Sequence, residues 1–164
     1  MNKFFVLLFA AFLFVSCSLK SSDNTKDDSI NGVNEVLDNW HHAAAVADFE
    51  TYFNAFSKDA IFIGTDASEY WNKKEFQEYA KPYFDKHKAW NFKSQNRHVH
   101  VNGDVAWFDE LLDTHMGVCR GSGVLQKENQ QWKIKHYVLS LTIPNSKMKR
   151  VSNFIKEKDT ILLK

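Results

Sequence analysis

His136 is one of two polar side chains whose sequence environment suggests contact with a bound molecule. The residues from Gln131 to Ile143 alternate in character, which is typical of a strand with one buried face. The face that carries Trp132 and Ile134 would also carry His136, and we predict that it points inward. A histidine there is either a core residue satisfied by a hydrogen bond or a ligand contact with acid–base capacity.

Arg120 is the second such side chain. Cys119, Gly121 and Gly123 surround it, so its strand has little other bulk. Arginine is rarely buried without a partner. If Arg120 points inward, it requires an acidic partner, either an acidic ligand or a carboxylate of the chain itself. The carboxylates available are those of Asp66, Glu69, Asp109 and Glu110. An internal ion pair and a ligand site both remain open.

Histidine pairs give little support for a metal centre. His98 and His100 would share one strand face, and His41 and His42 are adjacent on a predicted helix. A metal site needs three or four converging ligands. We therefore predict no metal and no other cofactor, with the strand pair solvated or paired across strands.

The N-terminal residues have the order of a signal peptide. Lys3 precedes an apolar run from Phe4 to Val15, which is too short to span a membrane as a helix. Ser16 then precedes Cys17, an order that resembles a lipoprotein signal, although Phe14 stands where leucine is usual. We predict that residues 1–16 are removed and that Cys17 carries a lipid, which anchors the chain outside the cytoplasm of a bacterium.

Composition favours one domain behind this anchor. Residues 17–29 are polar and predict a flexible tether, residues 30–145 have the length of one domain, and residues 146–164 form a tail. Lys149 to Lys158 in this tail is compatible with a short helix. The net charge of +1 and the lack of a basic stripe argue against nucleic acid as a partner.

Apolar spacing predicts three helices in the first half of the domain. The first begins at Ile30, with Ser29 as its N-cap, and the second follows Asp48 and includes Phe56. A short strand from Ala60 to Gly64 comes next. Asn72 followed by Glu75 resembles a capping box that opens the third helix.

The second half predicts four long strands. They run from Trp90 to Val101, Asp104 to His115, Val118 to Glu128, and Gln131 to Ile143. Asn102-Gly103 is a strong hairpin signal, so we predict an antiparallel meander. Packing the helices on one face of this sheet gives an α+β fold, and a strongly curved sheet would leave a cone-like cavity.

Several blocks of sequence carry a likeness to a known family, over about Val33 to Ile143. They are Asp48–Phe53, Phe56–Ala60, Phe62–Trp71, Ala106–Glu110, Arg120–Leu125 and Trp132–Tyr137. Together with this order of elements, they resemble the SnoaL-like domains of the nuclear transport factor 2 superfamily. The superfamily contains isomerases, cyclases, dehydratases, carriers and assembly domains, so the resemblance implies the fold more than an activity.

The resemblance also suggests a possible enzymatic arrangement. Related enzymes that abstract a proton beside a carbonyl use a carboxylate base and a hydroxyl or carboxyl that stabilises the oxyanion, as in ketosteroid isomerase. Glu69 or Asp66 could be that base, with Tyr52 or Tyr83 as the hydroxyl. No position matches the isomerase motif residue by residue, and acids in loops are commonly caps or surface groups.

Our main hypothesis from the sequence is a lipid-anchored module that binds a small, acidic or aromatic molecule. Its predicted contacts are Arg120, His136, Trp40, Tyr52, Tyr83 and Trp107. The alternatives are an isomerase-like or cyclase-like enzyme and an assembly domain without a ligand. The resemblance implies a homodimer formed through the open sheet face, where we expect Tyr137, Leu139 and Leu141 to be exposed.

Overall fold

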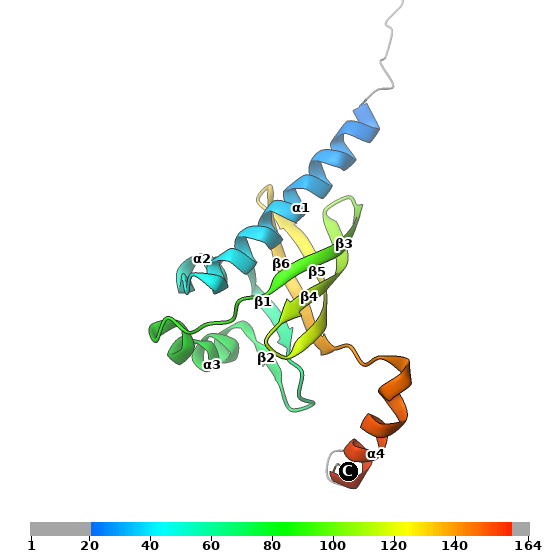
Figure 1. Cartoon of the computed structure of the whole chain (residues 1–164). Coiled ribbons are helices and arrows are strands. Elements are labelled where there is room, and N and C mark those ends of the chain that lie inside the picture. Colours follow the sequence, from blue (N-terminus) through cyan, green and yellow to red (C-terminus); the bar gives the residue numbers. More distant parts are fainter. Residues whose placement is uncertain (1–20, 159–164) are drawn as a thin grey trace, which may run out of the picture.

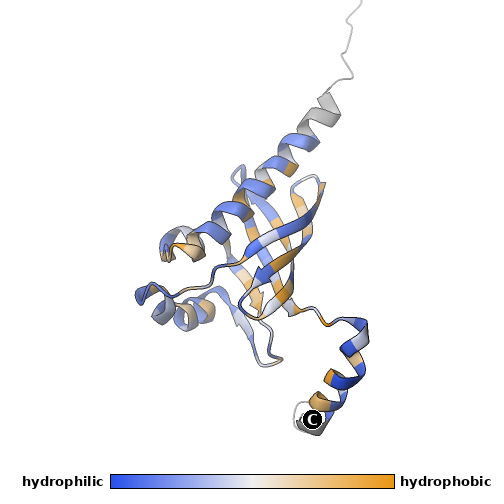
Figure 2. Ribbon diagram, in the orientation of Figure 1, coloured by the Kyte–Doolittle hydropathy of each residue, from blue (hydrophilic) through white to orange (hydrophobic). Residues whose placement is uncertain are grey.

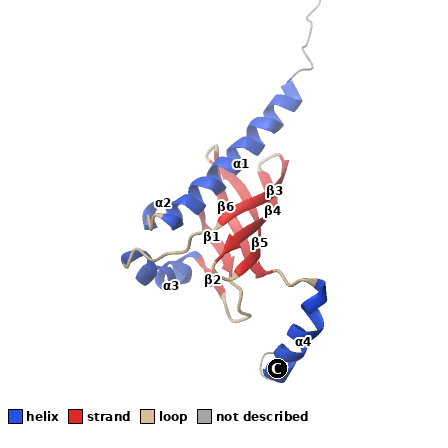
Figure 3. Ribbon diagram, viewed as in Figure 1, coloured by secondary structure: helices blue, strands red, loops and turns tan. Residues whose placement is uncertain are grey.

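The computed structural model describes residues 21–158, in which three helices pack on one face of a six-stranded sheet and a fourth lies beyond it (Figures 1 and 3). The helices are α1 (Ser21–Ala45), α2 (Phe49–Asn54), α3 (Lys73–Asp85) and α4 (Met148–Lys158), with a 3₁₀ turn, η1 (Asn145–Lys147). The strands are β1 (Phe56–Ile63), β2 (Tyr70–Asn72), β3 (Lys93–Asn102), β4 (Val105–Thr114), β5 (Gly117–Glu128) and β6 (Gln131–Leu141). The predicted α+β class is confirmed. The predicted signal segment and Cys17 lie outside the described residues.

The sheet has the strand order β2-β1-β6-β5-β4-β3, and β3 to β6 form the predicted antiparallel meander. The β3–β4 hairpin forms where it was predicted, but its two-residue loop is Gly103-Asp104, because Asn102 still pairs with Val105; Gly103 has φ +59°. One pairing differs from an antiparallel sheet, because β1 runs parallel to β6. After β1 the chain passes through β2 and α3 before it enters the meander at β3. The last strand of the meander, β6, then lies beside β1 and runs in the same direction.

Helix α1 begins at Ser21, well before the predicted start at Ile30 with Ser29 as its N-cap. Residues 21–29, which were predicted to belong to a flexible tether, are therefore helical. From Lys26 onward, where the burial of its side chains is described, the buried stripe begins at Val33 and continues through Leu37 and Trp40. Elongating a helix from a packed nucleus costs much less than starting one, so a polar segment can extend it. Hydrophilic residues predominate along α1 in Figure 2.

The segment between α2 and α3 differs from the prediction at two points. Helix α2 ends at Asn54, and Phe56 belongs to β1 rather than to the second helix. Tyr70 to Asn72 forms the short strand β2, which had no separate signal in the sequence. The capping box of Asn72 and Glu75 is confirmed, and both of its hydrogen bonds are present.

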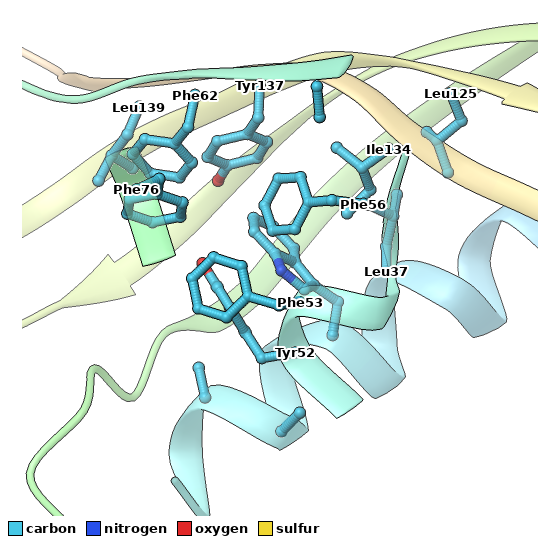
Figure 4. Packing of buried hydrophobic residues seen from close by; sticks show 14 of the residues in the cluster. Leu37, Tyr52, Phe53, Phe56, Phe62, Phe76, Leu125, Ile134, Tyr137 and Leu139 are labelled. Atoms are coloured by element: carbon cyan, nitrogen blue, oxygen red, sulfur yellow. The ribbon is translucent and has the colours of Figure 1, made fainter. Parts of the chain in front are cut away.

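Aromatic rings dominate the core between the helices and the sheet (Figure 4). Phe62 stacks on Phe76 with ring centroids 3.9 Å apart, which joins β1 to α3. Tyr52 stacks on Trp40 at 5.1 Å, which joins α2 to α1. Large rigid rings bury much area but cannot fill every gap, so this packing is compatible with a residual cavity.

Two β-bulges change which side chains face the core. In β6, His136 pairs with Val124 and Ile134 pairs with Leu125, so Lys135 is an extra residue. Alternation therefore reverses after Ile134, and Tyr137 and Leu139 become buried. The prediction that His136 faces inward is wrong for this reason, and so is the expectation that Tyr137 and Leu139 are exposed.

The second bulge lies in β3, where pairing to β4 shifts between Gln95 and His98. Asn96 adopts φ +48° there. The extra residue turns Arg97 toward the core side, whereas His98 stays exposed. Bulges of this kind often redirect a side chain beside a functional site.

The C-terminal part of the described chain leaves the sheet through η1 and forms α4, as the tail composition suggested. In Figure 1, α4 lies beyond the end of the sheet opposite the first turns of α1. Among residues 21–158, no helix combines the length and apolar character needed to cross a bilayer.

Candidate functional site

A cavity of about 250 Å³ lies between the helices and the concave face of the sheet. Its walls come from α1, α2, β1, α3 and β6, through Trp40, Tyr52, Phe62, Phe76 and Tyr137 respectively. Most of the wall is apolar, which is typical of sites for small organic molecules.

The open end of the cavity is marked by lining residues that are themselves exposed. Thr65 belongs to the loop between β1 and β2, and His115 and Met116 form the turn between β4 and β5. Glu69 also lines the cavity from the β1–β2 loop. The mouth therefore lies between these two connections.

Three polar groups in the cavity wall are buried without a hydrogen-bond partner of good geometry in the described structure. They are the indole Nε1 of Trp40 and the hydroxyls of Tyr52 and Tyr137. Figure 4 shows the Tyr137 hydroxyl pointing from the sheet toward the helices and the Tyr52 hydroxyl pointing from α2 toward the sheet. Since buried polar groups are nearly always satisfied, this cluster suggests a missing acceptor.

Both hydroxyls remain protonated at neutral pH. Burial raises the pKa of Tyr52 well above its ordinary value and outweighs the opposite effect of the Trp90 and Trp40 indoles. Burial also raises the pKa of Tyr137, and the negative charge of Glu110 adds to the effect. The cavity thus presents hydrogen-bond donors rather than phenolate anions.

The position of the Tyr137 hydroxyl depends on Gly121 in β5. A Cβ atom on Gly121 would lie 2.3 Å from this hydroxyl and 3.0 Å from the ring carbon that bears it. The β6 bulge turns Tyr137 inward, and the absence of a side chain at Gly121 gives its ring room.

A charged network lies behind one wall of the cavity. His41, which lines the cavity from α1, is bonded through Nε2 to Oε1 of Glu110 at 2.7 Å. Oε2 of Glu110 accepts hydrogen bonds from the Ser94 hydroxyl at 2.5 Å and from Arg97 Nε at 2.9 Å. Arg97 also pairs with Asp38 on α1 at 2.7 Å.

Glu110 is ionised within this network although its side chain is fully buried. Burial opposes ionisation, but the hydrogen bond and charge of His41, the charge of Arg97 and the Ser94 hydroxyl outweigh it and lower the pKa of Glu110. A buried carboxylate satisfied on both oxygens is a rigid partner for an imidazole.

Two of the ligand contacts predicted from the sequence, Trp40 and Tyr52, line the cavity. Their contact with a ligand stays a prediction. Tyr83 lies outside this wall, with 45% of its surface exposed, and Trp107 is 47% exposed on the outer face of β4. Alternation in β4 explains the second case, because Ala106 and Phe108 take the inward positions.

Neither predicted polar anchor lines the cavity. The side chain of Arg120 is 51% exposed and pairs on the outer sheet face with Asp109 at 3.0 Å. The expectation that it projects inward is wrong, because its strand neighbours Cys119 and Gly121 hold the buried positions. His136 is directed away from the cavity by the bulge at Lys135.

Of the two carboxylates proposed as bases, Glu69 and Asp66, only one lines the cavity. Glu69 lines the cavity, and its Oε2 accepts a hydrogen bond from the backbone N–H of Asp66 at 3.2 Å. Asp66 does not line the cavity; its Oδ1 accepts bonds from the backbone and hydroxyl of Ser68, which lower its pKa. Asp66 therefore shapes the loop.

His41, Glu110, Arg97 and Tyr137 were not identified as a site from the sequence. The bulges in β3 and β6, which interrupt the two-residue period without a glycine or proline to mark them, turn Arg97 and Tyr137 inward. The adjacent acidic pair Asp109-Glu110 was the only sequence signal for this site. In a strand with one buried face, alternation must place one of two neighbouring carboxylates inside. Within residues 21–158, no group of three histidine, cysteine or acidic side chains is arranged to hold a metal ion.

Solved structures with the same fold share little sequence with this chain. An NTF2-like protein of unknown function from Pseudomonas putida KT2440 is 14% identical, with a TM-score of 0.63 over 73% of this chain and 90% of that one. A putative dehydratase of the NTF2-like family from Streptomyces avermitilis is 14% identical, with a TM-score of 0.64 over 72% and 99%. A putative aromatic ring hydroxylase from Novosphingobium aromaticivorans is 16% identical, with a TM-score of 0.61 over 72% and 92%.

These similarities concern the fold alone, and a comparison with curated protein sequences gives no match. A family model, described as a SnoaL-like domain, matches residues 33–144. That range runs from the first buried residue of α1 to the end of the sheet and includes every wall of the cavity. The chain therefore belongs to the SnoaL-like domain family, with the NTF2-like fold.

Proposed function

We propose that this domain binds a small, flat, mainly apolar molecule that carries an acceptor oxygen. The observation that supports this function is the group of unpartnered donors on Trp40, Tyr52 and Tyr137 in the wall of an aromatic cavity. A carbonyl or ether oxygen within reach of two of these groups would satisfy donors that are otherwise costly to bury.

The lining favours a neutral ligand over an acidic one. Arg120, which would have paired with an acid, lies outside, and the described lining contains no lysine or arginine. Glu110 adds negative charge behind the wall, although Arg97 compensates it. A flat ring could pack among Phe62, Phe76 and neighbouring aromatic side chains.

Calorimetric titration with 1-tetralone and with tetralin, which has the same rings but no carbonyl, tests this proposal. We expect the ketone to bind more tightly and to shift the indole N–H resonance of Trp40. Tyr137→Phe and Tyr52→Phe should each weaken ketone binding by about 3- to 10-fold, the contribution of one hydrogen bond.

Tyr70→Phe is the matched control, because Tyr70 is 61% exposed and lies outside the cavity wall. It should leave the affinity for 1-tetralone unchanged. If neither compound binds, because water or side chains satisfy the donors, the proposed ligand site is wrong. Equal affinity for the two compounds would also contradict an oxygen-recognising site.

We also propose that the domain works outside the cytoplasm, anchored by a lipid on Cys17. The order of Lys3, the apolar run from Phe4 to Val15, and Ser16 supports this location. Cys17→Ser should leave the precursor uncleaved and unlabelled by radioactive palmitate. Cys119→Ser is the control, since Cys119 is buried in β5 and should not affect processing. Normal processing of Cys17→Ser would refute the anchor.

A homodimer formed through the outer face of the sheet completes the proposal. Val105, Trp107 and Val118 are large apolar residues with 40–52% of their surface exposed on this face of β4 and β5. Trp107 also stacks on His100 of β3, with ring centroids 5.5 Å apart. An apolar surface of this kind on a sheet is typical of a protein contact.

A further inference from the structure

His41 combines three features that the proposed binding function does not require. It lines the cavity, only 7% of its surface is exposed, and its Nε2 is bonded to a fully buried carboxylate. Simple binding of an apolar molecule would not need a buried ion network held at this wall.

The hydrogen bond to Glu110 fixes the tautomer of His41. Glu110 is ionised and accepts the bond, so in the neutral imidazole the proton lies on Nε2 and the lone pair lies on Nδ1. Glu110 does not line the cavity, whereas the imidazole does. With Nε2 committed to Glu110, Nδ1 is the ring nitrogen left to accept a proton from a bound molecule.

Glu110 is itself held in place from three sides. Ser94 and Arg97 donate to its second oxygen, and Arg97 is fixed in turn by Asp38. A base oriented by a buried, fully bonded carboxylate is the arrangement that makes histidine an effective proton acceptor. The donors on Tyr52 and Tyr137 line the same cavity, where they can stabilise negative charge left on the ligand.

We propose that His41 Nδ1 is a general base that removes a proton from a molecule bound in the cavity, with Glu110 as its positioning residue. This inference rests on the proposed binding function and adds an activity to it. His41 takes the role of base for which Glu69 and Asp66 were the candidates in the sequence. Glu69 belongs to the mouth loop and Asp66 lies outside the cavity.

The charged groups of the His41 network are Glu110 on β4, Arg97 on β3 and Asp38 on α1. The other titratable groups that share the cavity with His41 are Tyr52, Glu69, Tyr79, His115 and Tyr137. Glu110 is the direct partner, so removing its charge should destabilise the imidazolium more than any other single change.

Elimination of 5-nitrobenzisoxazole provides a direct test, because the reaction needs only a base. Nδ1 would take the proton from C3, the C–H electron pair would form the nitrile, and the N–O bond would break. The bond's electrons then stay on the phenolate oxygen of 2-cyano-4-nitrophenolate, and the imidazolium returns its proton to water. The probe is small, flat and aromatic, as the cavity requires.

We expect the intact protein to accelerate this elimination at least about 100-fold over the same concentration of free imidazole. His41→Gln should remove the acceleration, because its amide can still donate to Glu110 but cannot accept the proton. His98→Ala is the control; His98 lies exposed on the outer face, paired with Asp109. This variant should retain the full rate.

Glu110→Gln tests positioning rather than contact. In the intact protein the rate should rise with pH as the imidazole loses its proton. In the variant this rise should move to lower pH, because the neutral amide no longer stabilises the imidazolium. A pH–rate profile that is unchanged in a folded Glu110→Gln variant would refute the positioning role. Circular dichroism tests whether His41→Gln and Glu110→Gln are folded.

Binding of 5-nitroindazole separates the two proposals, because this compound has the same outline but no N–O bond to break. If 5-nitroindazole binds and the elimination is no faster than in imidazole, or is unaffected by His41→Gln, the base assignment is wrong and the binding site stands. If neither 5-nitroindazole nor 1-tetralone binds, both proposals fail together.

Discussion

Asp109 and Glu110 are adjacent in β4 but have opposite environments. Asp109 lies on the outer face with Arg120 and His98, whereas Glu110 is fully buried with His41 and Arg97. Both acids were possible partners for Arg120 in the sequence. Strand alternation alone requires this separation, but deciding which acid is buried requires the register of β4 against its neighbours.

The first prediction at the residue scale concerns the acid stability of Glu110. Its lowered pKa means that folding favours the ionised form, so this contribution to stability is present at neutral pH. It is lost as the pH falls below the ordinary carboxyl range through the lower value of the folded state. Glu110→Gln should cost about 3 kcal/mol at neutral pH, because Arg97 loses its buried partner.

The measurement is urea unfolding of both proteins over a series of pH values. The difference in free energy of unfolding should shrink as the pH falls below the ordinary carboxyl range, where Glu110 of the intact protein becomes protonated too. A difference that stays constant over the whole series would contradict the proposed ionisation.

The second prediction concerns Gly121. Gly121→Ala would place a Cβ atom against the hydroxyl and ring of Tyr137, so the ring must move. We expect a loss of about 1–3 kcal/mol in unfolding free energy, the usual result of overpacking a core. The double variant Gly121→Ala, Tyr137→Phe should recover part of this loss, because it removes the closest atom. Thermal and urea unfolding measure both effects, and a double variant no more stable than Gly121→Ala would exclude this contact as the cause.

At the scale of elements, the fold was largely predictable where local signals and periodicity agree. The capping box at Asn72 was predicted correctly, and so was a hairpin at this point of the chain, although its two-residue loop is Gly103-Asp104 rather than Asn102-Gly103. The bulges at Asn96 and Lys135 were not predictable, because one extra residue leaves a strand polar and apolar in nearly the same proportions. Each bulge reverses which side chains of its strand face the core. The fold could therefore be predicted, whereas the inward positions of Arg97 and Tyr137 could not.

Helix α1 allows a prediction about which part of an element stabilises the domain. The turns before Ile30 precede the buried stripe, which begins at Val33. Deleting residues 18–29 should leave the melting temperature within about 2 °C, because little apolar area is lost. Leu37→Ala, in the buried part of the same helix, should cost about 2–5 kcal/mol. Thermal melts followed by circular dichroism compare the two, and a large loss on truncation would show that the exposed turns stabilise the fold.

At the scale of the whole molecule, the proposed dimer makes the two faces of the sheet serve different purposes. The concave face holds the cavity, and the outer face carries Trp107 and Val118. Trp107→Glu should convert the dimer to a monomer in sedimentation experiments, because a charge would be buried without a partner. Binding of 1-tetralone should persist in this variant. A wild-type chain that sediments as a monomer would refute the dimer, and so would a Trp107→Glu variant that stays dimeric.

The direction of α1 has a consequence for how a ligand would arrive. The first turns of α1 leave the body at one end, and β2, next to the mouth loop, lies toward the other end in Figure 1. The helical turns before Ile30 span roughly 13 Å at 1.5 Å per residue. In a chain held at Cys17, the opening would thus lie toward the end of the domain away from the anchored helix. We therefore expect its cargo to be captured from solution rather than extracted from the bilayer.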